Sequence, residues 1–173
     1  MRTIEKPRDG EFAPYAIMYI GLLPDDGAVL DHMRESLRTT TELVRAIPAA
    51  RHAVPYAEGK WTVKEVVAHV IDDERIYAYR ALRFARNDAT ELPGFDQDHF
   101  ARYSGANARD MESLLSELAE VRAATISLFE SFDDEMLLRS GVADGNRMTV
   151  RAAAYHIAGH ELHHANGLRT NYA

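Results

Sequence analysis

Four long stretches of the chain carry apolar residues at spacings of three, four and seven, which bring them onto one face of an α-helix. They cover Pro24–Ile47, Thr62 to about Asn87, about Ala108 to Phe132, and the residues after Thr149 nearly to the C-terminus. No segment alternates apolar and polar residues clearly enough to predict a β-strand. The pattern therefore predicts an all-α fold, a four-helix bundle.

Local signals refine this prediction. Thr62 and Glu65 have the spacing of a capping box, in which each side chain satisfies a free backbone N–H at the start of a helix. The apolar segment Pro14–Gly21 predicts a short extra N-terminal helix that packs over one end of the bundle. Turn-forming residues fill Leu92–Asp98, after the second stretch.

Length and composition narrow the class of protein. A chain of 173 residues suits one domain, so we expect residues 1–173 to form a single unit. The formal net charge of −7 weighs against a nucleic-acid partner, and the absence of cysteine excludes disulfides and thiolate ligands. The charged N-terminus does not resemble a signal peptide, and no run of about 18 apolar residues could span a membrane. We therefore expect a cytoplasmic protein with no membrane partner.

Histidine is concentrated near the C-terminus, where four of the eight copies lie between positions 156 and 164. Residues four apart share one face of a helix and lie about 6 Å apart along its axis. His160 and His164 fall on the inward seam of the fourth stretch, where Leu or Ile would normally stand. His156 and His163 fall to either side of that seam. His160 and His164 are therefore the pair expected to point into the bundle.

Two imidazoles inside a bundle need a partner, because neutral rings lose hydrogen bonds to water and charged rings repel each other. A divalent cation resolves both difficulties by accepting the nitrogen lone pairs of neutral rings. His69, on the inward side of the second stretch, could supply a third ligand. Asp73, one turn later, could orient His69 or act as a further ligand. The alternative is a set of ordinary core or surface histidines.

The segment His160–His164 also matches the H-E-x-x-H pattern of zinc proteases, in which the glutamate is a general base. Those enzymes usually take a third ligand well downstream and carry a sheet beside the helix. Only nine residues follow His164 and no sheet is predicted, so a protease is not favoured. Glu161 remains a candidate catalytic group beside a metal-activated water, with a solvated surface glutamate as the alternative.

Other charged residues give weaker signals. Arg80, Arg83 and Arg86 lie late in the second stretch and could meet an anionic substrate, although such residues more often form a solvated face. Asp96 and Asp98 could border the mouth of a site, but turn chemistry alone explains them. The sequence contains no Gly-rich phosphate loop and no G-x-S-x-G elbow.

Several motifs occur in a characteristic order: GKWTVKEVVAH at 59–69, AYRALRFAR at 78–86, LPGFDQD at 92–98 and HIAGHELHH at 156–164. In this order they resemble the DinB-like (DinB/YfiT) superfamily, and the likeness covers nearly the whole chain. The resemblance implies a four-helix bundle that holds one divalent ion, commonly zinc or nickel, on three histidines. By motif position these are His69, His160 and His164.

The resemblance also implies a homodimer, since members of the superfamily are often dimeric. Some members resemble transferases that use low-molecular-weight thiols, and others are labelled metal-dependent hydrolases. We therefore expect a metal-dependent enzyme that activates a thiol or water against a small-molecule substrate, with thiol transfer preferred. The alternatives are hydrolysis at the same site, a non-enzymatic metal-binding stress protein, and a helical interaction module whose histidines merely titrate.

Overall fold

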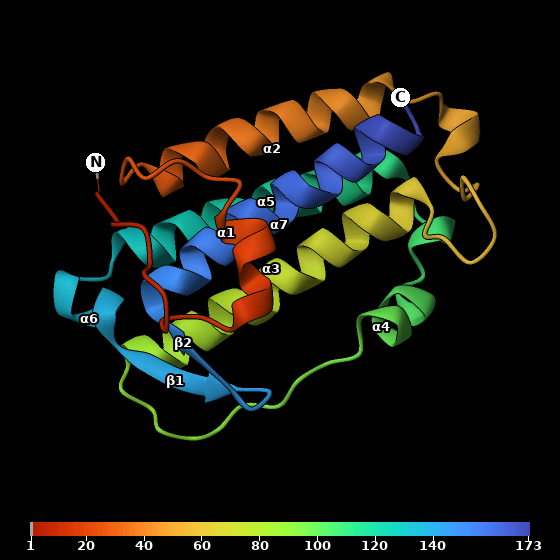
Figure 1. The fold of residues 1–173 in the computed structure, drawn as a ribbon. Helices are drawn as coiled ribbons and strands as arrows, with labels where there is room; N and C mark the ends of the chain where they lie inside the picture. Colours follow the sequence, from red (N-terminus) through yellow and green to blue (C-terminus); the bar gives the residue numbers. More distant parts are fainter. Residues whose placement is uncertain (1) are drawn as a thin grey trace.

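The structure, a computed structural model, describes residues 2–173. Its long helices are α2 (Val29–Ala46), α3 (Val63–Ala85), α5 (Met111–Glu130) and α7 (Val150–Asn171), which form a bundle (Figure 1). The predicted all-α bundle of four helices is therefore confirmed. Within residues 2–173, no helix has both the length and the apolar character needed to cross a lipid bilayer.

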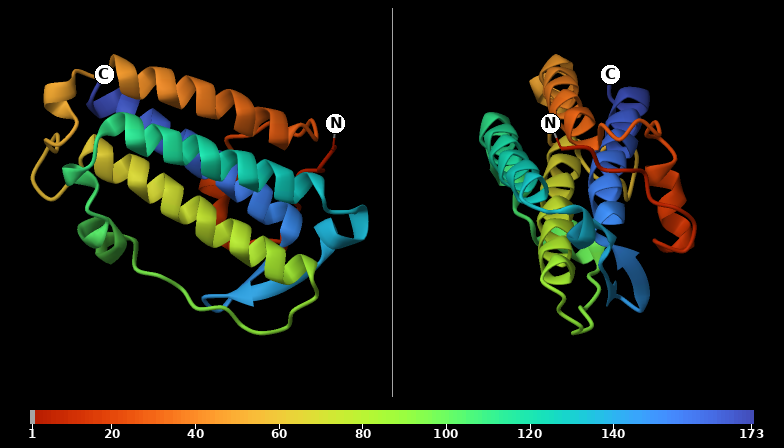
Figure 2. Two further views of the ribbon diagram at one scale, coloured as in Figure 1. Left: turned by 180° about the vertical axis from the view of Figure 1, so that it is seen from behind. Right: turned by 90° about the vertical axis from the view of Figure 1, so that its left-hand side faces the viewer.

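The long helices pack around the bundle in the cyclic order α2, α7, α3, α5 (Figure 2). α2 and α7 run in one direction, while α3 and α5 run in the other (Figure 1). α2 and α3 follow each other in the chain but lie on a diagonal, so residues 47–62 span the end of the bundle. α7 packs against α2, α3 and α1 (Ile17–Ile20), which explains why all of residues 150–161 are buried.

The helix starts follow from capping chemistry. The Thr62 side chain accepts the Glu65 backbone N–H while the Glu65 carboxylate accepts the Thr62 N–H, so the predicted capping box is present. α2 begins at Val29 rather than at the predicted Pro24. Gly27, with φ of 71°, occupies the left-handed region, and this turn keeps the preceding residues out of the helix.

A short β-hairpin contradicts the prediction that the chain contains no strand. β1 (Ser140–Ala143) and β2 (Asn146–Thr149) pair antiparallel, with Ser140 opposite Thr149. Asp144 and Gly145 connect them with φ values of 53° and 69°, as a type I′ turn requires. The strands have four residues each, too few for an alternating pattern, and the Asp-Gly pair was the signal that periodicity missed.

The remaining elements are short. They are the 3₁₀ turns η1 (Pro14–Ala16), η2 (Ala49–Arg51) and η3 (Ala106–Ala108), and the helices α4 (Gln97–Tyr103) and α6 (Asp134–Leu138). The predicted N-terminal helix is present as η1 and α1, but its predicted place at one end of the bundle is wrong. α1 instead lies along the middle of α7 (Figure 1).

Two apolar clusters fill the bundle, one toward each end. α3 contributes Val70 to one cluster and Ala81 to the other, and α7 likewise contributes Leu168 and Ile157. The segments between these residues carry buried polar groups, including histidines and carboxylates. The structure therefore places buried polar groups between two hydrophobic cores, and the candidate site lies in this region, with His69 beside Val70 at its edge.

Candidate metal centre

Three imidazoles from two helices meet inside the bundle. The Nε2 atom of His160 lies 3.0 Å from Nε2 of His69 and 3.1 Å from Nε2 of His164. The nitrogen atoms that the three rings offer all lie within 4.8 Å of one another. The structure thus brings together His160 and His164, the pair selected by the seam of the fourth stretch, and His69, the third ligand expected from the second stretch.

Burial keeps these rings neutral. It lowers the pKa of His160 to about 3 and that of His164 to about 2, and it also lowers the pKa of His69. At neutral pH each ring therefore carries one N–H and one nitrogen lone pair. Trp61 covers two of them, with ring centroids 4.7 Å from His69 and 6.2 Å from His164. Three lone-pair donors consequently converge on one space, with His69 and His160 buried and His164 half-buried.

The donor set fits a divalent transition metal. Hydrogen bonds among the three rings cannot satisfy all of their nitrogen atoms. The single Nε2 atom of His160 faces the Nε2 atoms of two other imidazoles at hydrogen-bond distance. One cation can accept a lone pair from all three rings. Imidazole nitrogen favours zinc, nickel, copper or iron over magnesium and calcium, which prefer oxygen.

Asp73 supports the centre from behind His160. Its Oδ2 atom lies 3.3 Å from His160 Nδ1 and 3.5 Å from His156 Nε2. Asp73 therefore approaches His160 and not, as one sequence-based possibility had it, His69. The His156 ring stacks on Tyr77 with a centroid separation of 3.7 Å, so His156 stays outside the trio. His163 lies against Tyr19 at 5.3 Å, also outside it.

The position of Glu161 does not suit the predicted role beside a metal-activated water. Its side chain is fully buried on another face of α7, where Oε2 accepts a hydrogen bond from Arg122 Nη1 at 2.8 Å. Arg122 also binds both carboxylate oxygens of Glu74. Because successive helical residues point about 100° apart, a neighbour of an inward ligand faces a different helix. We withdraw Glu161 as a candidate general base.

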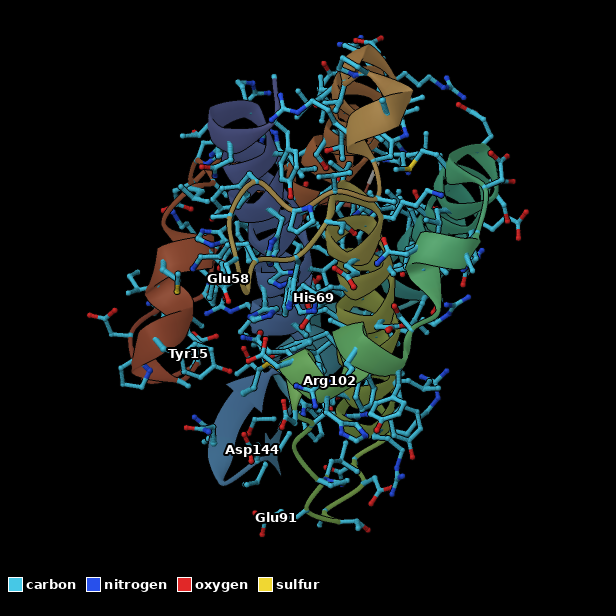
Figure 3. All side chains as sticks on the ribbon, turned by 90° about the vertical axis from the view of Figure 1, so that its right-hand side faces the viewer. Tyr15, Glu58, His69, Glu91, Arg102 and Asp144 are labelled. Carbon is cyan, nitrogen blue, oxygen red and sulfur yellow. The ribbon has the colours of Figure 1, made fainter. Side chains whose placement is uncertain are left out.

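Two cavities flank the imidazoles. His164 and Trp61 line a cavity of about 400 Å³, together with Lys60, Asp98 and Tyr172. His160 lines a second cavity of about 300 Å³; its other lining residues are Tyr15, Tyr19, Asp73, Tyr77, Arg80, Phe95, Gln97, Asp144 and His156. In Figure 3, His69 lies at the centre between α3 and α7, with Tyr15 and Asp144 below it toward the second cavity.

The other charged candidates separate into distinct roles. Asp96 caps α4 by accepting the backbone N–H groups of Asp98 and His99, whereas Asp98 lines the first cavity. Arg83 binds Asp88 at the surface and Arg86 is exposed, but Arg80 is buried beside the second cavity.

Sequence reasoning missed the aromatic walls of the site. Trp61 was conspicuous as the single tryptophan, although nothing in the sequence placed it over histidines. Tyr19 meets His156, His160 and His163 edge-on because α1 lies against α7. The helical period contains no information about that contact between segments far apart in the chain.

Comparison with known sequences identifies relatives. A family model described as the DinB superfamily matches residues 32–167. A curated protein of Oceanobacillus iheyensis, named "Putative metal-dependent hydrolase OB0413", is 27% identical over 125 residues. The match covers 71% of this chain and 71% of that relative.

Solved structures share the fold. One is YfiT from Bacillus subtilis, described as a probable metal-dependent hydrolase with an unusual four-helix bundle topology. It has a TM-score of 0.68 and 20% sequence identity, and the match covers 97% of this chain and 94% of the YfiT chain. The four-helix bundle protein TT2238 has a TM-score of 0.62 and 21% identity, covering 82% and 96%. A mycothiol-dependent maleylpyruvate isomerase has a TM-score of 0.68 and 13% sequence identity, and the match covers 85% of this chain and 61% of the isomerase chain.

Proposed function

This chain belongs to the DinB superfamily, and from that premise we propose that it is an enzyme that holds one divalent metal on His69, His160 and His164 and transfers a low-molecular-weight thiol to a small electrophile. The observation that carries the proposal is the convergence of three neutral imidazoles, two buried and one half-buried, beside two cavities. In such a transfer the thiol sulfur bonds to an electrophilic carbon, the thiol loses its proton, and the leaving group departs with its electron pair.

The roles of the chain's own groups follow from their positions. A zinc or nickel ion, when bound, would act as a Lewis acid that lowers the pKa of a thiol or water. Asp73 favours the His160 tautomer with its proton on Nδ1, so the Nε2 lone pair faces the other two rings. Trp61 packs against His69 and His164 and Tyr19 meets His160 edge-on, so aromatic rings cover part of the trio.

The two cavities favour transfer over hydrolysis. A transfer between two organic molecules needs two binding places beside the reacting group, and His164 and His160 each line one cavity. The same fold also occurs in a mycothiol-dependent isomerase. Hydrolysis is the second candidate, because the curated relative is named as a metal-dependent hydrolase and one cavity with water would suffice.

The test combines metal analysis with two activity assays. Zinc-loaded and nickel-loaded protein are assayed with 1-chloro-2,4-dinitrobenzene in the presence of glutathione or L-cysteine, and separately with p-nitrophenyl acetate. We expect one metal per chain and thiol-dependent turnover, with both lost in His160→Ala. His163→Ala, three residues along the same helix, is the matched control and should retain both. Turnover of the ester that ignores added thiol would favour hydrolysis, and no stoichiometric metal would contradict the centre itself.

A further inference from the structure

Arg80 is a buried arginine without a carboxylate partner. Only 5% of it is exposed, and no carboxylate among residues 2–173 forms an ion pair with it. The two other buried arginines each bind two carboxylates: Arg122 pairs with Glu74 and Glu161, and Arg151 pairs with Glu5 and Glu11. Among the buried arginines of residues 2–173, Arg80 is therefore the exception in having no carboxylate partner.

The contacts of Arg80 occupy only part of its hydrogen-bonding capacity. Its Nη2 donates to the carbonyl oxygen of Pro93 at 3.1 Å, and its guanidinium carbon lies 4.8 Å from the centroid of the Tyr77 ring. A guanidinium has five N–H donors in a planar fork. A charge removed from water is costly unless it is paired. The remaining donors of Arg80 open onto the adjoining cavity, where an anion could accept from them in place of water.

The cavity beside Arg80 also borders the metal centre, through His160. Arg80, His160 and Asp73 all line the space of about 300 Å³, which lies at the small end of the range for ligand sites, about 300–1,000 Å³. Tyr15, Tyr19 and Tyr77 provide aromatic walls. An anion held by Arg80 would consequently lie in the same enclosure as a metal ligand.

The charges around this cavity favour a singly charged anion. Asp73 lines its inner end and is already engaged by His156 and His160. Asp144 lines the cavity from the exposed turn of the hairpin, where water screens it (Figure 3). Arg80 supplies one positive charge, and the carboxylates of Asp73 and Asp144 lie nearby. The cavity therefore suits a monoanion better than a phosphate dianion. The planar fork of arginine also matches the two oxygens of a carboxylate.

We propose that Arg80 binds the carboxylate of the electrophilic substrate and so determines its class: a small, flat monocarboxylate whose body lies between the tyrosine rings. The assignment of this ligand as a substrate rests on the proposed thiol transfer. The anion site itself rests on the burial of Arg80 and on the cavity, and it does not require the metal.

Binding of benzoate tests the site, with benzamide as an uncharged probe of the same shape. Isothermal titration calorimetry is carried out on the full chain, both metal-free and zinc-loaded. We expect benzoate to bind both forms, and benzamide to bind much more weakly. Arg80→Gln should weaken benzoate binding about ten- to hundredfold, because a hydrogen-bonded charge is lost, and should leave benzamide unaffected. Arg86→Gln, which removes the same charge from the exposed end of α3, is the matched control and should bind as the unmodified protein does.

Three results would overturn the proposal: benzoate binding no tighter than benzamide, equal benzoate affinity in Arg80→Gln, or benzoate binding that appears only with zinc. Circular dichroism and thermal unfolding establish that the variants fold. Should Arg80→Gln fail to fold, Arg80→Lys replaces it, with an intermediate loss expected and an unchanged affinity counting against the site. Failure of the thiol-transfer assay with benzoate binding intact would refute the proposed function and leave the carboxylate site standing.

Discussion

The Oδ2 atom of Asp73 lies 3.3 Å from Nδ1 of His160, on the far side of the ring from the Nε2 atom that faces His69 and His164. A carboxylate in this position favours a proton on Nδ1 and directs the lone pair of Nε2 toward the centre. Asp73 is therefore a positioning residue. It acts on a metal only through the orientation and basicity of His160.

Replacement of Asp73 should weaken metal binding without abolishing it. We expect Asp73→Ala to reduce zinc affinity about 10- to 100-fold, as is usual for the loss of such a supporting group. Asp73→Asn should recover part of that loss, since its amide oxygen can still accept from Nδ1. Competition with a chromophoric chelator at neutral pH measures the affinity. Asp72→Asn, the adjacent residue on α3, serves as the control, and an Asp73→Ala protein with unchanged zinc affinity would remove the positioning role.

Gly159 sets the distance between α1 and α7. A Cβ atom at this position would lie 2.2 Å from the backbone oxygen of Tyr19, so the two segments could not keep their present separation. Gly159→Ala should therefore destabilise the protein by about 1–3 kcal/mol, the usual effect of overpacking. Gly167→Ala on the same helix has no neighbouring atoms within 4 Å and should instead stabilise it by up to about 1 kcal/mol. Urea unfolding compares the two, and similar effects at both positions would show that the close approach to Tyr19 is not limiting.

Much of the bundle could be predicted because local chemistry determines it. Thr62 with Glu65 marks the start of α3, and the inward seam of α7 leads to His160 and His164. These signals lie within one turn or on one helical face, so the sequence contains them directly. His69 was found by the same reasoning, since it lies between buried valines on the inward side of α3.

The rest depended on contacts between distant segments. The place of α1 is set by the absence of a side chain at Gly159, and no helical period shows that Tyr19 would use that space. Glu161 was assigned to catalysis because it stands beside His160 in the chain, but Arg122 of α5 binds it on another face. Arg80 was grouped with Arg83 and Arg86 by spacing, and only the fold shows that Arg80 alone is buried by a cavity.

The buried cluster of Glu74, Arg122 and Glu161 should contribute to stability and not to chemistry. Burial alone would lower the pKa of Arg122, but Glu161 and Glu74 raise it above its usual value, so the guanidinium stays charged. Arg122→Met would leave two buried carboxylates without their partner and should destabilise the protein by about 3–5 kcal/mol. Chemical denaturation at neutral pH measures this change. A loss below about 1 kcal/mol would mean that both carboxylates find other partners.

The milder variant Glu161→Gln separates structure from catalysis. It keeps a side chain of similar shape that can still accept from Arg122, so we expect destabilisation of about 1–3 kcal/mol. Zinc affinity and the rate of any thiol transfer should remain within about twofold of the unmodified protein, a change worth less than 0.5 kcal/mol by the ~1.4 kcal/mol-per-tenfold rule. A folded Glu161→Gln protein that binds zinc normally but has lost activity would restore the catalytic role from the H-E-x-x-H pattern.

The ion pair of Glu11 and Arg151 should make stability depend on pH in the acid range. Glu11 anchors the segment before α1 to the start of α7, where its carboxylate accepts from Arg151 Nε at 2.7 Å and Thr149 Oγ1 at 3.0 Å. The hydrogen bond from Arg151 lowers the pKa of Glu11 below its ordinary 4.5, against the opposing effect of burial. The folded state then binds fewer protons than the unfolded state between these two pKa values, so stability rises with pH through that range. The stabilisation from this ion pair is complete above the pKa of Glu11 in the unfolded state and is lost as the pH falls through its pKa in the folded state.

Arg151→Gln should therefore cost about 1 kcal/mol at pH 7, since the pair is partly hydrated, and clearly less at pH 3. Urea unfolding with a chelator present measures both, with the exposed Arg169→Gln of the same helix as control, and an Arg151→Gln effect of equal size at the two pH values would exclude this ion pair as its source.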